Sequence, residues 1–145
     1  MRERLSISGL KTWKTMDWPG YQGNLLLDGE RIAWFHNDGN GGEMDYTVTK
    51  SVEFGELLDW IKTLPLIKSE EFKGLEITED IETIVDEMVA DIELEKKLKR
   101  YRKKSLVYRI EGDPKNMFRA INTLDKAVAE KNIRIEFPTQ TITYL

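Results

Sequence analysis

Five side chains in the last third of the chain form the best candidate for a binding site. They are Lys103, Lys104, Arg109, Arg119 and Asn122. The planar guanidinium group of arginine donates two parallel hydrogen bonds, which suits a phosphate or a carboxylate. Arg119 and Asn122 are three residues apart and would share one face of a helix. The alternative is that Arg109 and Arg119 pair with acids such as Glu111 or Asp125 in a polar layer.

Catalytic side chains are scarce in this chain. Histidine often serves as a general base near neutral pH, and the chain has only one, His36. The absence of cysteine excludes disulfides, thiolate metal sites and cysteine nucleophiles. The loop over 38–42 lacks both the late acidic ligand of a calcium loop and the Gly-Lys-Ser/Thr ending of a phosphate-binding loop. We therefore predict no catalytic residue, no metal and no cofactor, with a small enzyme centred on His36 as an alternative.

The composition limits the classes of protein to consider. A chain of 145 residues is long enough to bury one hydrophobic core. Its 22 basic and 26 acidic side chains give a net charge of -4, which does not fit a general nucleic-acid coat but leaves room for a local basic patch. No apolar run is long enough for a signal peptide or a membrane span. The sequence therefore indicates one domain over 1–145, cytoplasmic and without membrane contact.

Residues 1–50 have the pattern of an antiparallel β meander. Alternating apolar residues predict strands over 5–13, 21–27, 31–36 and 44–48. Asp28-Gly29 between two such runs is a strong hairpin signal. The loop over 38–42 holds three glycines, which indicates that its backbone approaches another group closely. Gly9 interrupts the first strand, where a bulge would let Leu10 change face.

Residues 51–104 are predicted to be helical. The first helix begins with Ser51 as N-cap and ends at Pro65. A connector over 66–77 follows, and Thr78 caps a long helix. One apolar stripe of that helix contains Ile81, Ile84, Val85, Met88 and Ile92, and a second, nearly opposite, contains Leu94, Leu98 and Tyr101. Either the helix breaks near 91–94, or it continues and its second half packs on a different partner. Because no glycine or proline intervenes, we expect the second.

Charge is sharply divided along this segment. Residues 66–95 carry 11 acidic and 2 basic side chains, whereas residues 96–104 carry 7 basic and no acidic ones. This order matches the helix dipole and is typical of a solvated helix. Clustered carboxylates also mimic phosphate, so the acidic part could instead occupy a nucleic-acid channel of a partner. The candidate partner-binding residues are Trp18, Glu82, Asp86, Glu93, Leu94, Leu98 and Tyr101. The second apolar stripe also makes a homodimer a hypothesis.

Residues 105–145 read as strand–helix–strand. Leu106–Ile110 alternates as a strand, and Asp113 followed by Pro114 has the form of an N-cap and a first helical residue. Ile133, Ile135 and Phe137 alternate as the next strand, and residues 142–144 could add a short edge. The sequence thus predicts an α+β fold with an N-terminal antiparallel sheet of about four strands packed by helices, one long charged helix and a C-terminal strand–helix–strand.

Two segments of the chain resemble a known group of proteins. One is the strand, Asp-Gly turn, strand and Asp-Gly-x-Gly-Gly loop over 24–42. The other runs from Lys103-Lys104-Ser105 through the strand with Arg109 to the aromatic-Arg-x-x-Asn segment that begins at Phe118. Together they resemble small uncharacterised proteins of bacteria, phages and other mobile elements. Those proteins often carry a cysteine where this chain has Arg102. The resemblance implies a genomic setting in which small inhibitors of host defence systems are common.

Three functions follow as hypotheses. The first is a non-enzymatic binding protein, such as a phage or mobile-element inhibitor of a host defence protein that processes nucleic acid. The second is a protein that binds a nucleotide or another small anion through the basic site. The third is a small enzyme centred on His36. The scarcity of catalytic groups favours the first, with a host protein as the partner.

Overall fold

The computed structural model describes residues 1–65, 67–68, 76–77 and 80–145. It shows an α+β fold with an N-terminal antiparallel sheet, as the sequence predicts. The chain divides into two compact units, Met1–Val89 and Ala90–Leu145, which are described separately here. Organisation as a single domain stays a prediction. Among the described residues, no helix combines the length and the apolar character needed to cross a membrane.

The N-terminal unit is built on a four-stranded sheet in which each strand pairs antiparallel with the next along the chain. A short 3₁₀ helix, Arg2–Arg4, precedes the strands β1 (Leu5–Trp13), β2 (Gly20–Leu27), β3 (Glu30–Asn37) and β4 (Asp45–Val48). The pairing of β1 with β2 shifts between Ser8 and Lys11, so the predicted bulge lies at Gly9, whose φ is +60°. The strand over 31–36 is central, as expected from its two apolar faces.

Two helices complete the core of this unit. They are α1 (Ser51–Lys62) and the first part of α2 (Ile81–Arg102). One face of the sheet packs against both, and the cluster includes Leu25 and Phe35 from strands, Leu57 from α1, and Val85 from α2. These four side chains are at most 1% exposed, so the burial of each contributes about 1.5–3 kcal/mol to the stability of the fold. Ser51 is not the N-cap of α1, because the helix already includes it and begins after Lys50.

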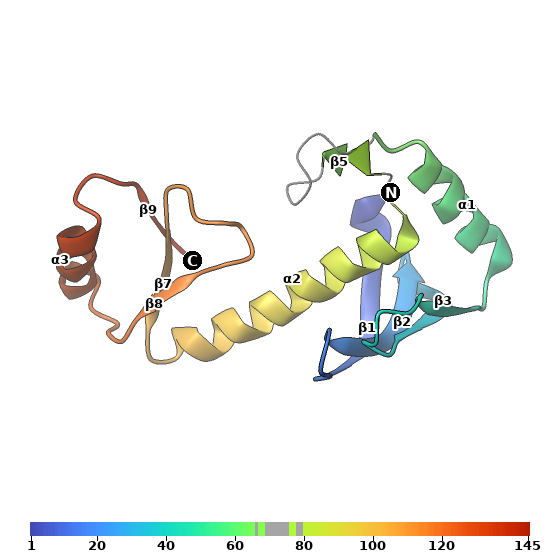
Figure 1. The fold of residues 1–145 in the computed structure, drawn as a ribbon, viewed down its shortest axis with the longest axis horizontal. Helices are drawn as coiled ribbons and strands as arrows, with labels where there is room; N and C mark the ends of the chain where they lie inside the picture. Colours follow the sequence, from blue (N-terminus) through green and yellow to red (C-terminus); the bar gives the residue numbers. More distant parts are fainter. Residues whose placement is uncertain (66, 69–75, 78–79) are drawn as a thin grey trace. The chain divides into compact units, whose positions relative to one another are not determined.

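The connector before α2 contains a short antiparallel pair that the sequence did not predict. Its strands are β5 (Ile67–Lys68) and β6 (Glu76–Ile77). Thr78, the predicted cap of α2, lies outside the described residues. The carboxylate of Asp80 performs that role, since it accepts the backbone N–H of Thr83 at 2.8 Å. From there α2 continues unbroken for 22 residues, as expected (yellow in Figure 1).

The C-terminal unit holds a three-stranded antiparallel sheet and one helix after the end of α2. The elements are β7 (Leu106–Ile110), β8 (Arg119–Ile121), α3 (Lys126–Glu136) and β9 (Ile142–Tyr144), and the strand order is β8-β7-β9. Tyr108, Ile110, Ala129 and Ile133 form its buried cluster. The strand–helix–strand order and the short last strand are confirmed. The predicted start of the helix and the predicted strand over 133–137 are wrong.

Asp113 and Pro114 do not start a helix. The carboxylate of Asp113 instead accepts the backbone N–H of Ile110 at 3.0 Å, and Gly112 has a φ of +93°, so the chain turns back towards β8. The helix begins twelve residues later, where Asp125 accepts the N–H groups of Ala127 and Val128. An Asp-Pro pair signals either a turn or a helix start, and here the glycine before it favours the turn.

Of the predicted strand over 133–137, the first four residues belong to α3 and Phe137 is the residue at which the helix ends. Ile133 is 3% exposed and Ile135 is 79% exposed, so the two side chains do not share a buried face. Ala129, four residues before Ile133, is also fully buried, which is the spacing of a helix. The alternation of isoleucine with charged residues over five positions was too short to distinguish the two periods.

A basic pocket at the end of α2

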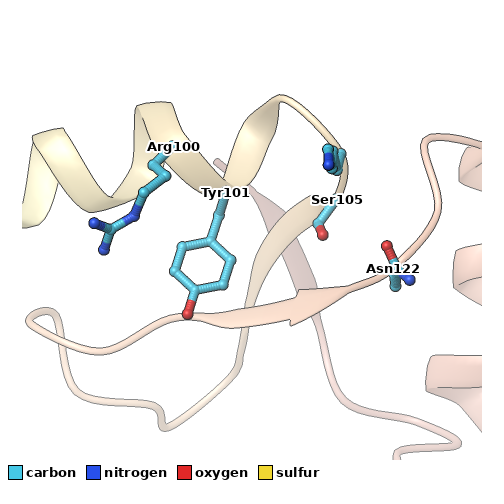
Figure 2. A pocket seen from close by; sticks show the side chains of 5 residues that line it. Arg100, Tyr101, Ser105 and Asn122 are labelled. Atoms are coloured by element: carbon cyan, nitrogen blue, oxygen red, sulfur yellow. The ribbon is translucent and has the colours of Figure 1, made fainter.

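The C-terminal unit contains a pocket with a volume of about 330 Å³. Its lining residues are Arg100, Tyr101, Lys104, Ser105 and Asn122. Figure 2 shows Arg100 and Tyr101 extending from the last turn of α2, Ser105 in the turn that follows, and Asn122 beside the end of β8. Two cations, an aromatic ring, a hydroxyl and an amide therefore meet in one place.

Short-range hydrogen bonds hold the helical side of this pocket. The carbonyl of Tyr101 accepts the N–H groups of Lys104 at 3.2 Å and Ser105 at 2.9 Å, which closes the turn after α2. The other side depends on strand pairing. Leu106 pairs with Ile121, and the N–H of Leu106 donates to the carbonyl of Thr123 at 2.9 Å. Since Asn122 lies between these two residues, the pairing brings its amide beside Ser105.

The ring of Tyr101 packs against another ring and remains partly exposed. It meets Phe118 edge to face, with centroids 5.4 Å apart and planes at 71°. Despite this contact, Tyr101 is 44% exposed. A planar group entering the pocket can therefore stack on a ring whose orientation is already set, which lowers the entropic cost of binding.

Most of the cations around the pocket have no acidic partner. In the basic segment 96–104, Lys96 pairs with Glu93 at 3.3 Å and Arg102 with Glu95 at 3.4 Å. The remaining five cations make no side-chain ion pair or hydrogen bond with any described residue: Lys97, Lys99, Arg100, Lys103 and Lys104. Two of these five line the pocket. Their charge is therefore available to an anionic ligand.

The two units carry opposite net charge. Residues 1–89 contain 9 basic and 18 acidic side chains, a net of -9, and residues 90–145 contain 13 basic and 8 acidic ones, a net of +5. The helix dipole places only about half a negative charge at the end of α2. Arg100 and Lys104 bring two full positive charges to the same end, so the pocket remains attractive to an anion.

Arg109 and Arg119 do not reach this pocket's lining. The guanidinium of Arg109 donates to the carbonyls of Met117, at 2.8 Å, and Lys115. Arg119 pairs with Asp113 at 2.9 Å and lies 4.7 Å from the ring centroid of Phe137. Both arginines thus hold the loop between β7 and β8, and the hydrogen bond from Arg119 lowers the pKa of Asp113.

The predicted arrangement of these arginines is corrected in two respects. Arg119 belongs to a strand, so it does not share a helix face with Asn122. The acid that pairs with Arg119 is Asp113, neither Glu111 nor Asp125. Of the predicted anion-binding residues, Lys104 and Asn122 line the pocket and Lys103 lies in the adjoining turn. Arg100 and Ser105 were missed, although helical spacing places Arg100 four residues before Lys104.

The acidic candidates Glu82 and Asp86 lie in the first turns of α2, and Glu93 lies in its second half. Burial raises the pKa of both Glu82 and Asp86, and the negative charge of Asp80 raises each further. The hydroxyl of Tyr21 donates a hydrogen bond to Asp86. Glu93 is already paired with Lys96. Burial is therefore the main cause of these raised pKa values, and neighbouring carboxylates add to it.

The apolar partner candidates differ in exposure. Trp18 is 64% exposed in the turn before β2. Leu94 is half-buried, and Tyr101 belongs to the pocket. Leu98 is only 6% exposed, so it is not available as a contact for a second copy of the chain. A homodimer stays a prediction, but it cannot rest on Leu98.

His36 lies on the sheet face opposite the core, among aromatic rings. Its ring centroid is 5.5 Å from Trp13 and 5.6 Å from Trp34, with planes at 15° in the second pair. Its Nδ1 lies 3.3 Å from Oε1 of Gln22. These contacts suit a structural role. Within the described ranges, no three His, Cys, Asp or Glu side chains come together in a group that could hold a metal ion.

The chain matches no protein-family model, no curated protein and no solved structure.

Proposed function

We propose that this protein is a non-enzymatic binding protein whose C-terminal unit binds a phosphate-bearing ligand. One observation carries the proposal. The pocket at the end of α2 brings together Arg100 and Lys104, neither of which pairs with an acid of the described chain, beside the exposed ring of Tyr101. Cations next to a stacking surface are the elements needed to hold a phosphate and a planar base.

Each lining residue has a role in this proposal. Arg100 offers a planar fork to two phosphate oxygens, and Lys104 offers a mobile point charge. The hydroxyl of Ser105 and the amide of Asn122 supply neutral hydrogen bonds that orient the ligand. A volume of about 330 Å³ is at the lower end of the range for small-ligand sites, which suits a mononucleotide.

Calorimetric titration with inorganic phosphate and with each of the four nucleoside monophosphates tests the proposal. Loss of a hydrogen bond to a charged group costs about 1.5–3 kcal/mol, so Lys104→Ala and Arg100→Ala should each weaken binding at least tenfold. Lys99→Ala is the matched control, because Lys99 is an unpaired cation on the same helix but does not line the pocket. No heat from any of these compounds, or equal losses in Lys99→Ala and Lys104→Ala, would refute the proposal.

A second candidate function uses the acidic surface of α2. In it, Glu82 and Asp86, with Glu93 further along, occupy a basic nucleic-acid channel of a host defence protein. The supporting observation is that Glu82 and Asp86 lie within electrostatic reach of Asp80; burial is the main cause of their raised pKa values, and this neighbouring negative charge adds to it. Binding a basic partner would relieve the repulsion among these carboxylates.

Charge reversal separates this second function from the first. Glu82→Lys with Asp86→Lys should abolish retention of a host protein that is captured at low salt and released at high salt. Glu93→Lys should have a smaller effect, because Glu93 is already paired. Retention that survives all three reversals would exclude the acidic surface as the binding site. Catalysis at His36 stays a prediction, and intact biological activity in His36→Ala would dispose of it.

A further inference from the structure

We infer that the natural ligand of the pocket is a single-stranded nucleic acid, of which the pocket holds one nucleotide. This inference rests on the proposed function and deepens it. It draws on three observations: the row of unpaired cations that continues from the pocket along α2, the exposed face of Tyr101, and the opposite net charges of the two units.

The cations extend beyond what a mononucleotide can use. Successive residues of a helix are 100° apart, so Lys97 and Arg100 fall within about 60° of one another around α2. Lys104, in the turn after the helix, lines the same pocket as Arg100. Lys97 does not line the pocket, yet it makes no ion pair with a described residue. From Lys97 to its end at Arg102, α2 rises about 8 Å, and Lys104 follows in the turn, so the row has about the length of two to three stacked nucleotides. This row therefore matches several consecutive phosphates.

The aromatic ring favours a single strand over a duplex. In a duplex the base faces are already stacked on their neighbours, whereas the bases of a single strand are free to stack on a protein ring. Tyr101 presents such a ring inside the pocket, and the ring of Phe118 packs against it nearly at right angles. The amide of Asn122 lines the same pocket and can donate to and accept from a base edge.

The charge of the two units predicts a short site. The net charge of +5 on residues 90–145 attracts a polyanion, and the net of -9 on residues 1–89 repels it. Contact is therefore confined to the basic unit. This explains how a chain with a net charge of -4 can bind nucleic acid without being a basic protein throughout.

The experiment compares uridine monophosphate with the eight-nucleotide strands U8 and dT8 by competition against a labelled strand. Both strands should bind at least tenfold more tightly than the monophosphate. Three neutralised phosphates give an expected slope of about -2 for log K against log salt concentration. A duplex of the same length should bind more weakly than either strand.

Variants identify the residues that contact the strand. Lys97→Ala should weaken binding of the strands about threefold or more and leave the monophosphate unchanged, whereas Lys104→Ala should weaken both. Tyr101→Ala should weaken the strands about fivefold or more, and Tyr101→Phe, which keeps the ring, should restore binding. Lys99→Ala, on a different face of α2, should change nothing. Circular dichroism of each variant verifies that it is folded.

The outcomes distinguish this inference from the proposed function. If the strands bind no more tightly than the monophosphate, or if the duplex binds as tightly as the strands, the inference is wrong and the proposed pocket function stands. If neither the monophosphate nor the strands bind, both are wrong. If the strands bind with full affinity to the Lys97→Ala variant, the row along α2 is not part of the site.

Discussion

Gly20 is expected to be the residue at which a single added methyl group most clearly perturbs the sheet. It is the first residue of β2 and pairs with Trp13, the last residue of β1. A Cβ at position 20 would come within 2.9 Å of Cδ1 of Trp13 and closer still to Nε1 and Cε2 of the same ring. The indole therefore occupies the space of the missing side chain, and in Gly20→Ala it must move away.

The cost follows from the contacts that the indole would lose. Its ring stacks near His36, at 5.5 Å between centroids, and such aromatic pairs contribute about 0.5–1.5 kcal/mol. Displacing a half-buried indole also exposes apolar area, and overpacking usually costs about 1–3 kcal/mol. We expect Gly20→Ala to lower the free energy of unfolding by about 1–3 kcal/mol, measured by urea denaturation with tryptophan fluorescence and circular dichroism.

Two comparisons make this reasoning refutable. Gly42→Ala is the matched control, because a Cβ there meets nothing within 4 Å and no positive φ is required, so it should change stability by less than about 0.5 kcal/mol. In the Trp13→Ala background the clash is absent, and Gly20→Ala should then cost little. An undiminished cost in that background would show that the indole is not the cause.

Two further perturbations test the helix start and the acidic surface. Asp125→Ala should destabilise the protein by about 1 kcal/mol, because the carboxylate caps α3 through the N–H groups of Ala127 and Val128; urea denaturation measures this, with the exposed Lys131→Ala as control. Asp86→Asn should alter the pH dependence of stability. Burial raises the pKa of Asp86 in the folded state, so this group favours folding at low pH and loses that contribution as the pH rises through its raised pKa. The stability of the Asp86→Asn variant relative to the natural protein should thus increase as the pH rises above about 3.9, the ordinary pKa of an aspartate, and a constant difference would contradict the raised pKa.

Signals in short stretches of sequence were sufficient to predict the N-terminal sheet. The Asp28-Gly29 turn joins β2 and β3, and Asp28 takes a φ of +51°, which an Asp-Gly turn allows. The glycine-rich loop also behaves as predicted at Gly39, where a Cβ would meet the carbonyl oxygen of Trp18 at 2.5 Å. In both places the information lies in neighbouring residues, which is why the sequence could reveal it.

Prediction of the C-terminal unit required knowledge of contacts between residues that lie far apart along the chain. Asp113 is a turn residue because Arg119 and the N–H of Ile110 bind its carboxylate, and neither partner is evident from the Asp-Pro pair. The pocket is similar in this respect. Lys104 and Asn122 were predicted, but they are 18 residues apart, and only the pairing of β7 with β8 explains why they meet. No spacing rule indicates such a pairing in advance.

The helix α2 has a consequence for any attempt to study the protein in pieces. The boundary between the compact units falls after Val89, inside this 22-residue helix. Division there would leave helical segments of 9 and 13 residues, and isolated helices shorter than about 12–15 residues are marginal in water. The first segment contains the core residues Ile84 and Val85, but it would lack the later helical turns of α2. Fragments that both contain all of α2 would avoid this loss, so limited overlap is the appropriate design for expressing either half.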